Sequence, residues 1–426
     1  MHASLSFRAG ALRTGLGFGA SLAAVRAADD PVMPLAIHGE TVYTMSGAPL
    51  KDGLILVRDG KIRHIGPAAG ITYTADHRVI RAKVVTPGFI DAHSTVGLSG
   101  ILNQPHDQDQ SDKSGSFQPE LRAIDAFNAR DPLIAHLRSF GVTTVNTGHA
   151  PSALGSGQTM IVKTHGRGAD RDVINPAAMT TVALGRNGLT AAEVTPGQGQ
   201  PSTKAPGTRA KAVAMLRAEL IKAQEYGKKR ENKDETKRPA RDLKYDTLLR
   251  AFDGSQPLLV NAHRQQDILS ALRIAKEFGV KLVLDGCADA PLVLAEIKAS
   301  GFPVILHPTM ARSNQDTENL SIETAAKLKA AGIPFALQSG FESYVPKIRV
   351  VLFEAAIAAA NGLGFDSALA SITIDAARLL GIANRTGSIE SGKDADLAFF
   401  DGDPFEYTSH ATGTVIDGVL FAETPR

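Results

Sequence analysis

The chain has 426 residues, of which 43% are hydrophobic and 21% are charged, and this composition excludes a disordered, collagen-like or coiled-coil protein. Its 46 basic and 44 acidic residues give a net charge of +2, which removes any global electrostatic argument for a nucleic-acid partner. The single cysteine, Cys287, excludes an internal disulfide and a cysteine-rich metal cluster, so packing must stabilise the fold.

The first 27 residues are predicted to be a signal peptide. Arg8 and Arg13 precede an apolar run of small residues at 16–25, and Val25 and Ala27 supply small residues at the cleavage positions. Glycines weaken the apolar run, which leaves an amphipathic or disordered N-terminus as the alternative. The signal peptide predicts a periplasmic or secreted protein. No run of eighteen apolar residues is found, so no membrane span is expected.

Short β-strand patterns lie near both ends of the remaining chain. Neither group of strands could bury a face by itself, so the two groups are predicted to pair into one composite β-sandwich of residues 31–86 and 386–426. The Asp59-Gly60 and Asp417-Gly418 dipeptides mark hairpin turns within it. The predicted strands are residues 41–45, 54–57, 61–65, 395–400, 414–416 and 419–421.

Between these ends, apolar strand-like runs alternate with helix-like segments. Eight such runs favour an α/β fold of the (β/α)8 TIM-barrel type over residues 87–385, with parallel strands and helical crossovers; a doubly wound sheet is the alternative. The lysine- and arginine-rich residues 228–244 interrupt the alternation and indicate a solvated helical insertion, or else a basic binding patch. The strands are expected at 89–93, 143–146, 160–163, 179–183, 258–261, 281–284, 303–306 and 334–337, and helices at 132–140, 210–226, 266–278, 290–299 and 322–331.

Two motifs resemble the amidohydrolase superfamily. Residues 86–93, TPGFIDAH, resemble its first barrel strand, P-G-F-I-D-x-H-x-H, and residues 387–397, GSIESGKDADL, followed by DGDP at 401–404, resemble its return into the β-sandwich. Residues 121–125 and 141–145 resemble the branch that contains imidazolonepropionase and related dipeptidases. The resemblance covers essentially the whole mature chain. It implies a metal-dependent hydrolase fold for C–N bonds, with the active site at the C-terminal mouth of the barrel.

The resemblance also implies a set of metal ligands, which this chain keeps only in part. His93 matches the first imidazole of strand one, but Thr95 stands where the second is usual, and a neutral hydroxyl is a poor zinc ligand. His263 matches the ligand of strand five. The bridging carboxylate maps to Lys163, which would have to be carboxylated, or to the segment in which Arg186 replaces a glutamate.

Two further family positions fall on glycines. The strand-six ligand aligns with Gly286, and the strand-eight aspartate, which binds metal and accepts the proton of the attacking water, aligns with Gly340. Without them, water activation and protonation of the leaving nitrogen lose their usual agent. Asp285 is expected to point away from the barrel axis, because it precedes the lost ligand by one residue. The residual set for at most one divalent ion, zinc, is His93, His263 and Lys163, with Asp285 or His307 as a helper.

Other residues are expected to line the pocket at the mouth. Asp91 is expected to orient His93 or to cap the end of its strand. Cys287 is expected to be a buried core thiol, although a nucleophile paired with His263 is the alternative. Ser152 and Ser156 are interpreted as turn serines. The predicted pocket residues are Asp91, Thr95, Asp285, His307 and Gln338.

The favoured hypothesis is a catalytically degenerate amidohydrolase homologue in which His93 and His263 are relics within the mouth. Its mouth would bind a small-molecule ligand or form an assembly surface, in a homo-oligomer or in a hetero-oligomer with an intact homologue. The alternative is an active metal-dependent hydrolase of amide, cyclic amide or small-peptide bonds, which holds one metal through His93, His263 and a non-standard donor. A nucleic-acid binder lacks both charge and motif.

Overall fold

The computed structural model describes residues 32–102, 104–189, 206–313, 315–341 and 349–422. The predicted signal peptide, residues 1–27, lies outside the described residues. Within the described ranges, no helix combines the length and the apolar character that crossing a membrane requires.

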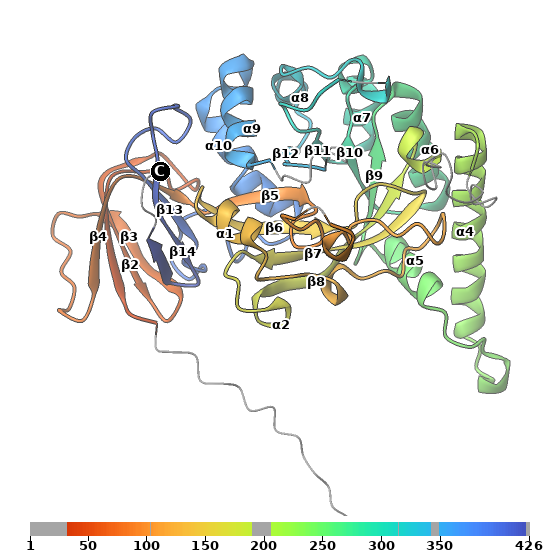
Figure 1. Ribbon diagram of the computed structural model, residues 1–426, viewed down its shortest axis with the longest axis horizontal. Helices are drawn as coiled ribbons and strands as arrows, with labels where there is room; N and C mark the ends of the chain where they lie inside the picture. The colour runs from red at the N-terminus through yellow and green to blue at the C-terminus, as the bar shows by residue number, and fades with distance from the viewer. Residues whose placement is uncertain (1–31, 103, 190–205, 314, 342–348, 423–426) are drawn as a thin grey trace, which may run out of the picture.

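All eight strands predicted for the barrel are present, and they form one eight-stranded sheet in the order β12-β11-β10-β9-β8-β7-β6-β5. A bridge between Ser94 and Gly340 connects the first strand to the segment after the last, so the sheet is nearly closed. The chain therefore forms an α/β TIM-like barrel (Figure 1). The strands are β5 (Phe89–Ser94), β6 (Val142–Gly148), β7 (Gly155–Lys163), β8 (Val173–Ala183), β9 (Leu258–Ala262), β10 (Leu282–Gly286), β11 (Val304–Leu306) and β12 (Phe335–Leu337).

The barrel differs from the prediction in the direction of one strand. β7 is antiparallel to both β6 and β8, whereas the sequence predicted eight parallel strands. The connections explain this: residues 149–154 join β6 to β7, and residues 164–172, with the short helix α2 (Ala169–Asp172), join β7 to β8. A parallel crossover needs a dozen or more residues, so these short connections can only reverse the chain. As a result Lys163 ends β7 opposite Thr144, near the start of β6 and at the base of the barrel.

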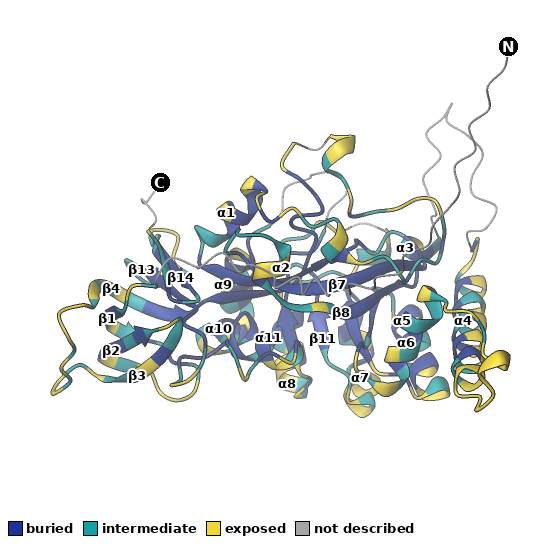
Figure 2. Cartoon of the chain, turned by 90° about the horizontal axis from the view of Figure 1, so that it is seen from below, coloured by how far each residue is buried: buried dark blue, intermediate teal, exposed yellow. Residues whose placement is uncertain are grey.

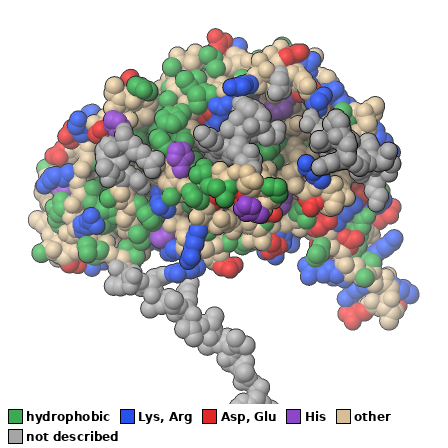
Figure 3. All heavy atoms as spheres, in the orientation of Figure 1, with side chains coloured by type: hydrophobic (Ala, Val, Ile, Leu, Met, Phe, Trp, Pro, Cys, Tyr) green, Lys and Arg blue, Asp and Glu red, His purple; other side chains and the backbone are tan. Residues whose placement is uncertain are grey.

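Helices cover the outside of the barrel, and each predicted helical segment contains one. α1 begins where Asp131 accepts a hydrogen bond from the Leu133 amide and proline occupies the first helical position. Residues 228–244 hold the end of α4, a 3-10 turn and the start of α5; Figure 3 shows basic and acidic side chains together on this projecting tip. The helices are α1 (Pro132–Arg138), α3 (Arg186–Leu189), α4 (Arg209–Arg230), α5 (Leu243–Asp253), α6 (Gln265–Phe278), α7 (Leu294–Ser300), α8 (Thr324–Ala331), α9 (Val351–Ala358), α10 (Phe365–Ser371) and α11 (Ile374–Leu379).

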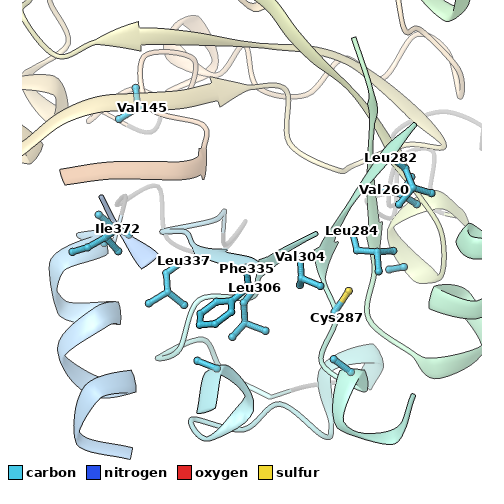
Figure 4. Packing of buried hydrophobic residues seen from close by; sticks show 14 of the residues in the cluster. Val145, Val260, Leu282, Leu284, Cys287, Val304, Leu306, Phe335, Leu337 and Ile372 are labelled. Carbon is cyan, nitrogen blue, oxygen red and sulfur yellow. The ribbon is translucent and has the colours of Figure 1, made fainter. Parts of the chain in front are cut away.

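Alternate residues of the barrel strands form two separate cores. One set, which includes Leu259, Val283 and Ile305, gathers inside the barrel against α11. The other set packs outward against the helices, and Figure 4 shows Leu306, Phe335 and Leu337 of this set beside one another. The strands are consequently buried on both faces, while exposed residues lie on the outer surfaces of the helices (Figure 2). This alternation fixes which side chains can reach the barrel interior.

A second sheet combines the two ends of the chain. Its seven strands have the order β15-β14-β13-β4-β1-β2-β3, and β13 pairs with β4 in antiparallel register. The predicted Asp59-Gly60 turn joins β2 to β3. All of these strands belong to one sheet, and the two-layered sandwich with its domain boundaries stays a prediction. The strands are β1 (Leu35–Val42), β2 (Leu50–Arg58), β3 (Lys61–Pro67), β4 (Arg78–Pro87), β13 (Leu397–Phe400), β14 (Ala411–Ile416) and β15 (Val419–Ala422).

Candidate functional site

A cavity of about 690 Å³ opens at the carboxyl ends of the parallel barrel strands. It is the place where ligands are bound in barrels of this type. The structure brings together there six of the eight residues predicted as metal ligands or pocket lining, namely His93, Thr95, His263, Asp285, His307 and Gln338. Lys163 and Asp91 are not among its lining residues.

Asp285 lines the cavity and has three side-chain partners. Its carboxylate lies 3.3 Å from His93 Nδ1, and it accepts hydrogen bonds from Gln338 Nε2 at 2.7 Å and Asn261 Nδ2 at 2.8 Å. Both ionisable side chains are almost fully buried.

Charge pairing governs the protonation of these two groups. Burial alone would raise the pKa of Asp285, but the His93 imidazole and the two amide donors hold it below its usual value. Burial would lower the pKa of His93, and the carboxylate of Asp285 outweighs this and raises it. The contact between His93 and Asp285 therefore favours the charged form of both groups.

The orientation of Asp285 contradicts the prediction that it points away from the barrel axis. Val283 belongs to the inner core, and Asp285 follows two residues later on the same face of β10. Gly286 ends the strand with φ +86°. The inward side chain at the end of β10 is therefore the carboxylate of Asp285, and both Asp285 and Gly286 line the cavity.

The two glycines at family positions have backbone conformations that disfavour side chains. Gly286 and Gly340 have φ values of +86° and +67°. A Cβ atom at 286 would lie 2.5 Å from Cε1 of His263, and one at 340 would lie 2.6 Å from Cγ of Pro308. Because the left-handed region strains most L-residues, a ligand side chain at either position would require the mouth to rearrange. The loops around the mouth are thus shaped for glycine.

Three imidazole nitrogens in the cavity wall lack a hydrogen-bond partner among the described residues. They are Nε2 of His93, Nδ1 of His263 and Nε2 of His307, and all three are buried. Burial lowers the pKa of His263, and it lowers the pKa of His307 to about 4, so both rings are neutral near pH 7. Buried polar atoms in native proteins nearly always have a partner, and such a set marks a place where a ligand or water binds.

The donors of the mouth do not fit the zinc site that the family resemblance implies. Within the described residues, no three histidine, cysteine, aspartate or glutamate side chains are grouped as a metal ion requires. The Nδ1 atom of His93 faces Asp285 directly, and the hydroxyl of Thr95 accepts a hydrogen bond from Ser99 at 3.0 Å. A catalytic zinc ion needs three protein donors and an open position, which this arrangement does not provide.

Lys163 lies at the base of the barrel, so its prediction as a metal ligand was wrong. Its Nζ is 2.8 Å from Asp394 and 3.0 Å from Asp396, and it also bonds Asp417. Burial would lower the pKa of Lys163, and the three carboxylates together raise it above its usual value. A lysine held charged in this way carries neither a carboxylate group nor a metal. The antiparallel direction of β7 is the physical reason for its position.

Asp91 contacts the loop after β12 instead of lining the cavity. Its carboxylate accepts hydrogen bonds from the amide and the hydroxyl of Ser339, and from the His93 backbone amide at 3.4 Å. Burial raises the pKa of Asp91 to about 6. The ring of His93 contacts Asp285, so of the two roles expected for Asp91 the orientation of His93 was wrong. Asp91 instead attaches β5 to the end of β12.

Sequence reasoning missed several residues of the mouth. Asn261 lies two residues after the inner-core Leu259 on β9, so strand alternation alone would have placed it inside the barrel. Lys113 and Arg312 come from irregular loops that carry no readable pattern. Arg186 lies at the mouth as well, in place of the expected glutamate. Cys287 is fully buried, and burial raises its thiol pKa well above the usual value, which excludes a thiolate nucleophile.

Comparisons with known proteins agree with the fold. The model of a family described as "Amidohydrolase family" matches residues 270–421. The amidohydrolase tasK of Hapsidospora irregularis is 24% identical over 407 residues, which cover 88% of this chain but only 39% of that protein. The imidazolonepropionase of Brucella anthropi is 23% identical over 365 residues, which cover 83% of this chain and 88% of that enzyme.

Two solved structures illustrate the range of similarity. An amidohydrolase from Thermotoga maritima MSB8 is 28% identical, with a TM-score of 0.83 over 91% of this chain and 100% of that chain. An adenosine deaminase from Xanthomonas campestris with bound zinc is 16% identical, with a TM-score of 0.51 over 91% of this chain and 92% of that chain, and shares the fold alone.

Proposed function

Because this chain belongs to the amidohydrolase superfamily, we propose that it is a non-hydrolytic member whose barrel mouth binds a small polar molecule. The observation that carries the proposal is the buried contact between His93 and Asp285. The Nδ1 atom of His93 lies 3.3 Å from the carboxylate of Asp285, and this contact raises the pKa of His93, so a metal ion would compete with a proton for the ring. The two groups neutralise each other where a hydrolase would hold a metal ion and a water molecule.

The unpartnered imidazoles support ligand binding at the same place. The rings of His263 and His307 are neutral, and each neutral imidazole can donate or accept one hydrogen bond through its free nitrogen. His93, when charged, offers a second N–H donor on the cavity side. A polar molecule with both donors and acceptors would satisfy these atoms, which otherwise remain buried at a cost in free energy.

Gly340 stands where the family resemblance implies the aspartate that accepts a proton during hydrolysis, so another carboxylate would have to take that role. In hydrolysis of an amide, a carboxylate must accept the proton of the attacking water and a proton must reach the leaving nitrogen. Asp285 lines the cavity, and both of its carboxylate oxygens are already engaged by His93, Gln338 and Asn261. It is therefore poorly placed to act as a general base.

Metal analysis of the purified chain tests the proposal. After incubation with zinc and dialysis, we expect much less than one zinc ion per chain, with no further loss in the His93→Ala or His263→Ala variant. His64→Ala is the matched control, because His64 is an exposed histidine on β3, outside the mouth. One full equivalent of zinc that is lost in H93A or H263A but kept in H64A would contradict the proposal.

An activity assay separates the proposed binder from the alternative enzyme. We expect no turnover of amide, cyclic amide or dipeptide substrates, with or without added zinc. Zinc-dependent turnover that disappears in H263A would establish the active hydrolase instead.

A further inference from the structure

A second cavity, of about 610 Å³, lies at the base of the barrel where it meets the end sheet. It is distant from the mouth, because Lys163 and its partners adjoin it and lie at the opposite end of β7 and β6. Cationic side chains from three separate parts of the chain face it, namely Lys61 of β3, Arg167 and Arg171 around α2, and Arg385 after α11.

The charges around this cavity are arranged in two layers. The carboxylates of Asp172, Asp394 and Asp396 are at most 3% exposed, whereas the side chains of Lys61 and Arg385 are 42% and 41% exposed. Asp394 accepts from Lys61, Lys163 and Arg385, and three cations thus share one buried carboxylate. The negative charge therefore lies beneath the cations, whose outer sides remain accessible.

Cationic side chains outnumber carboxylates in the wall of this cavity. The lining residues include four cations, Lys61, Arg167, Arg171 and Arg385, and three acids, Asp59, Asp394 and Asp417. Asp417 is 29% exposed, and its two oxygens are occupied by Lys163 and Arg167. Asp59 also lines the cavity, and it pairs with Arg63 at 3.1 Å.

His165 adds an unpartnered polar atom to the cavity wall. Its Nε2 is buried and has no hydrogen-bond partner among the described residues, while its ring packs edge-on against Phe421. Burial and the nearby Arg167 lower the pKa of His165, so the neutral ring can donate one hydrogen bond. A donor of this kind beside guanidinium groups suits an oxyanion.

We infer that this basal cavity binds a phosphate group, either free phosphate or the phosphate of a small molecule. Arginine guanidinium groups match the geometry of phosphate oxygens, and a lysine ammonium adds a compact charge. The carboxylates beneath hold these cations in place, so little ordering is needed when the anion binds. The inference is independent of the function proposed for the mouth.

Calorimetric titration of the full chain with inorganic phosphate tests the inference, with sodium chloride of matched ionic strength as the reference. We expect saturable binding that Lys61→Gln weakens by about tenfold, since a charge-assisted hydrogen bond is lost. K61Q should remain folded, because Asp394 keeps Lys163 and Arg385 as partners. Arg63→Gln is the matched control, a nearby exposed cation on the same strand that does not line the cavity. Glycerol 3-phosphate in place of inorganic phosphate distinguishes a phosphate ester from the free ion.

Two results would overturn the inference. One is that titration with millimolar phosphate gives no saturable heat of binding to the native chain. The other is that K61Q and the native chain bind phosphate with equal affinity. Hydrogen exchange gives an independent readout: phosphate should slow exchange in residues 165–172 and 385–394 and leave residues 110–116 at the mouth unchanged. Protection confined to the mouth would place the anion there and exclude the basal site.

Discussion

The two ends of the barrel both bury charged and polar groups, but they differ in how completely these groups are partnered. At the base, Lys163 contacts three carboxylates, and each of these carboxylates lies beside a cation. At the mouth, His93, His263 and His307 each keep one buried nitrogen without a partner among the described residues. The paired charges at the base fix the position of chain segments, and its cations keep accessible outer sides for an anion. The mouth instead offers unpartnered imidazole nitrogens to a ligand.

The largest expected effect is the removal of the central cation of the base. Lys163→Met leaves Asp396 and Asp417 buried or half-buried without their main partner, so we expect the free energy of unfolding to fall by about 3 to 5 kcal/mol. Urea denaturation measures this loss. The control is Lys61→Met, which removes a half-exposed cation of the same cluster and should cost about 1 kcal/mol or less. Equal losses in the two variants would show that the buried lysine does not hold the base together.

The next effect concerns an incompletely partnered carboxylate under the mouth. Glu354 of α9 is fully buried, accepts a hydrogen bond from the Met310 amide at 2.8 Å, and lies 3.9 Å from Arg349. Burial raises its pKa to about 7, from a usual value of 4.5. The folded state therefore binds the proton more tightly than the unfolded state, and this group's contribution to stability is lost as the pH rises from 4.5 to 7.

Glu354→Gln should remove that loss, because glutamine cannot ionise and keeps the acceptor oxygen for Met310. We expect the variant to gain on the order of 3 kcal/mol over the native chain between pH 4.5 and pH 8. Denaturation at several pH values measures the difference. Parallel stability profiles for the two proteins would contradict the assignment.

A smaller effect tests how closely the mouth is shaped around glycine. Gly286→Ala places a Cβ atom 2.5 Å from the His263 ring at φ +86°, and we expect it to cost about 2 kcal/mol and to displace that ring. The control is Gly279→Ala, where φ is +67° and no atom lies within 4 Å of the added carbon; it should cost about 1 kcal/mol from backbone strain alone. Urea denaturation gives both costs, and the NMR signals of the His263 ring report its displacement. If both substitutions cost the same and the ring signals do not move, His263 is not held by Gly286.

The sequence was sufficient for the number and position of the barrel strands but not for their directions. Apolar runs of four or five residues mark strands that are buried on both faces, and this pattern is identical in parallel and antiparallel strands. Only the short connections on either side of β7 carry the directional information. The end sheet was visible as hairpins, whereas the pairing of β13 with β4 joins residues too distant in the chain for any local pattern.

Strand direction also explains which site residues were predicted correctly. Histidines at the ends of strands, such as His263 and His307, reach the mouth because parallel strands all end there. Lys163 was misplaced because its strand is reversed, and Asp285 was expected to point outward although it lies two residues after the inner-core Val283. The partners of Lys163 lie more than two hundred residues away, so no spacing rule could have identified the basal cluster.

The composite end sheet also affects the order in which the protein can be completed during synthesis. β13 lies between β4 and β14, and the carboxylates that neutralise Lys163 belong to residues 394–417. A nascent chain that has not yet released these residues from the ribosome has an exposed edge on β4 and a lysine without counter-charges. The edge of β4 is therefore covered only when the final segment is complete, so translational arrest or proteolysis near residue 390 would leave an aggregation-prone intermediate.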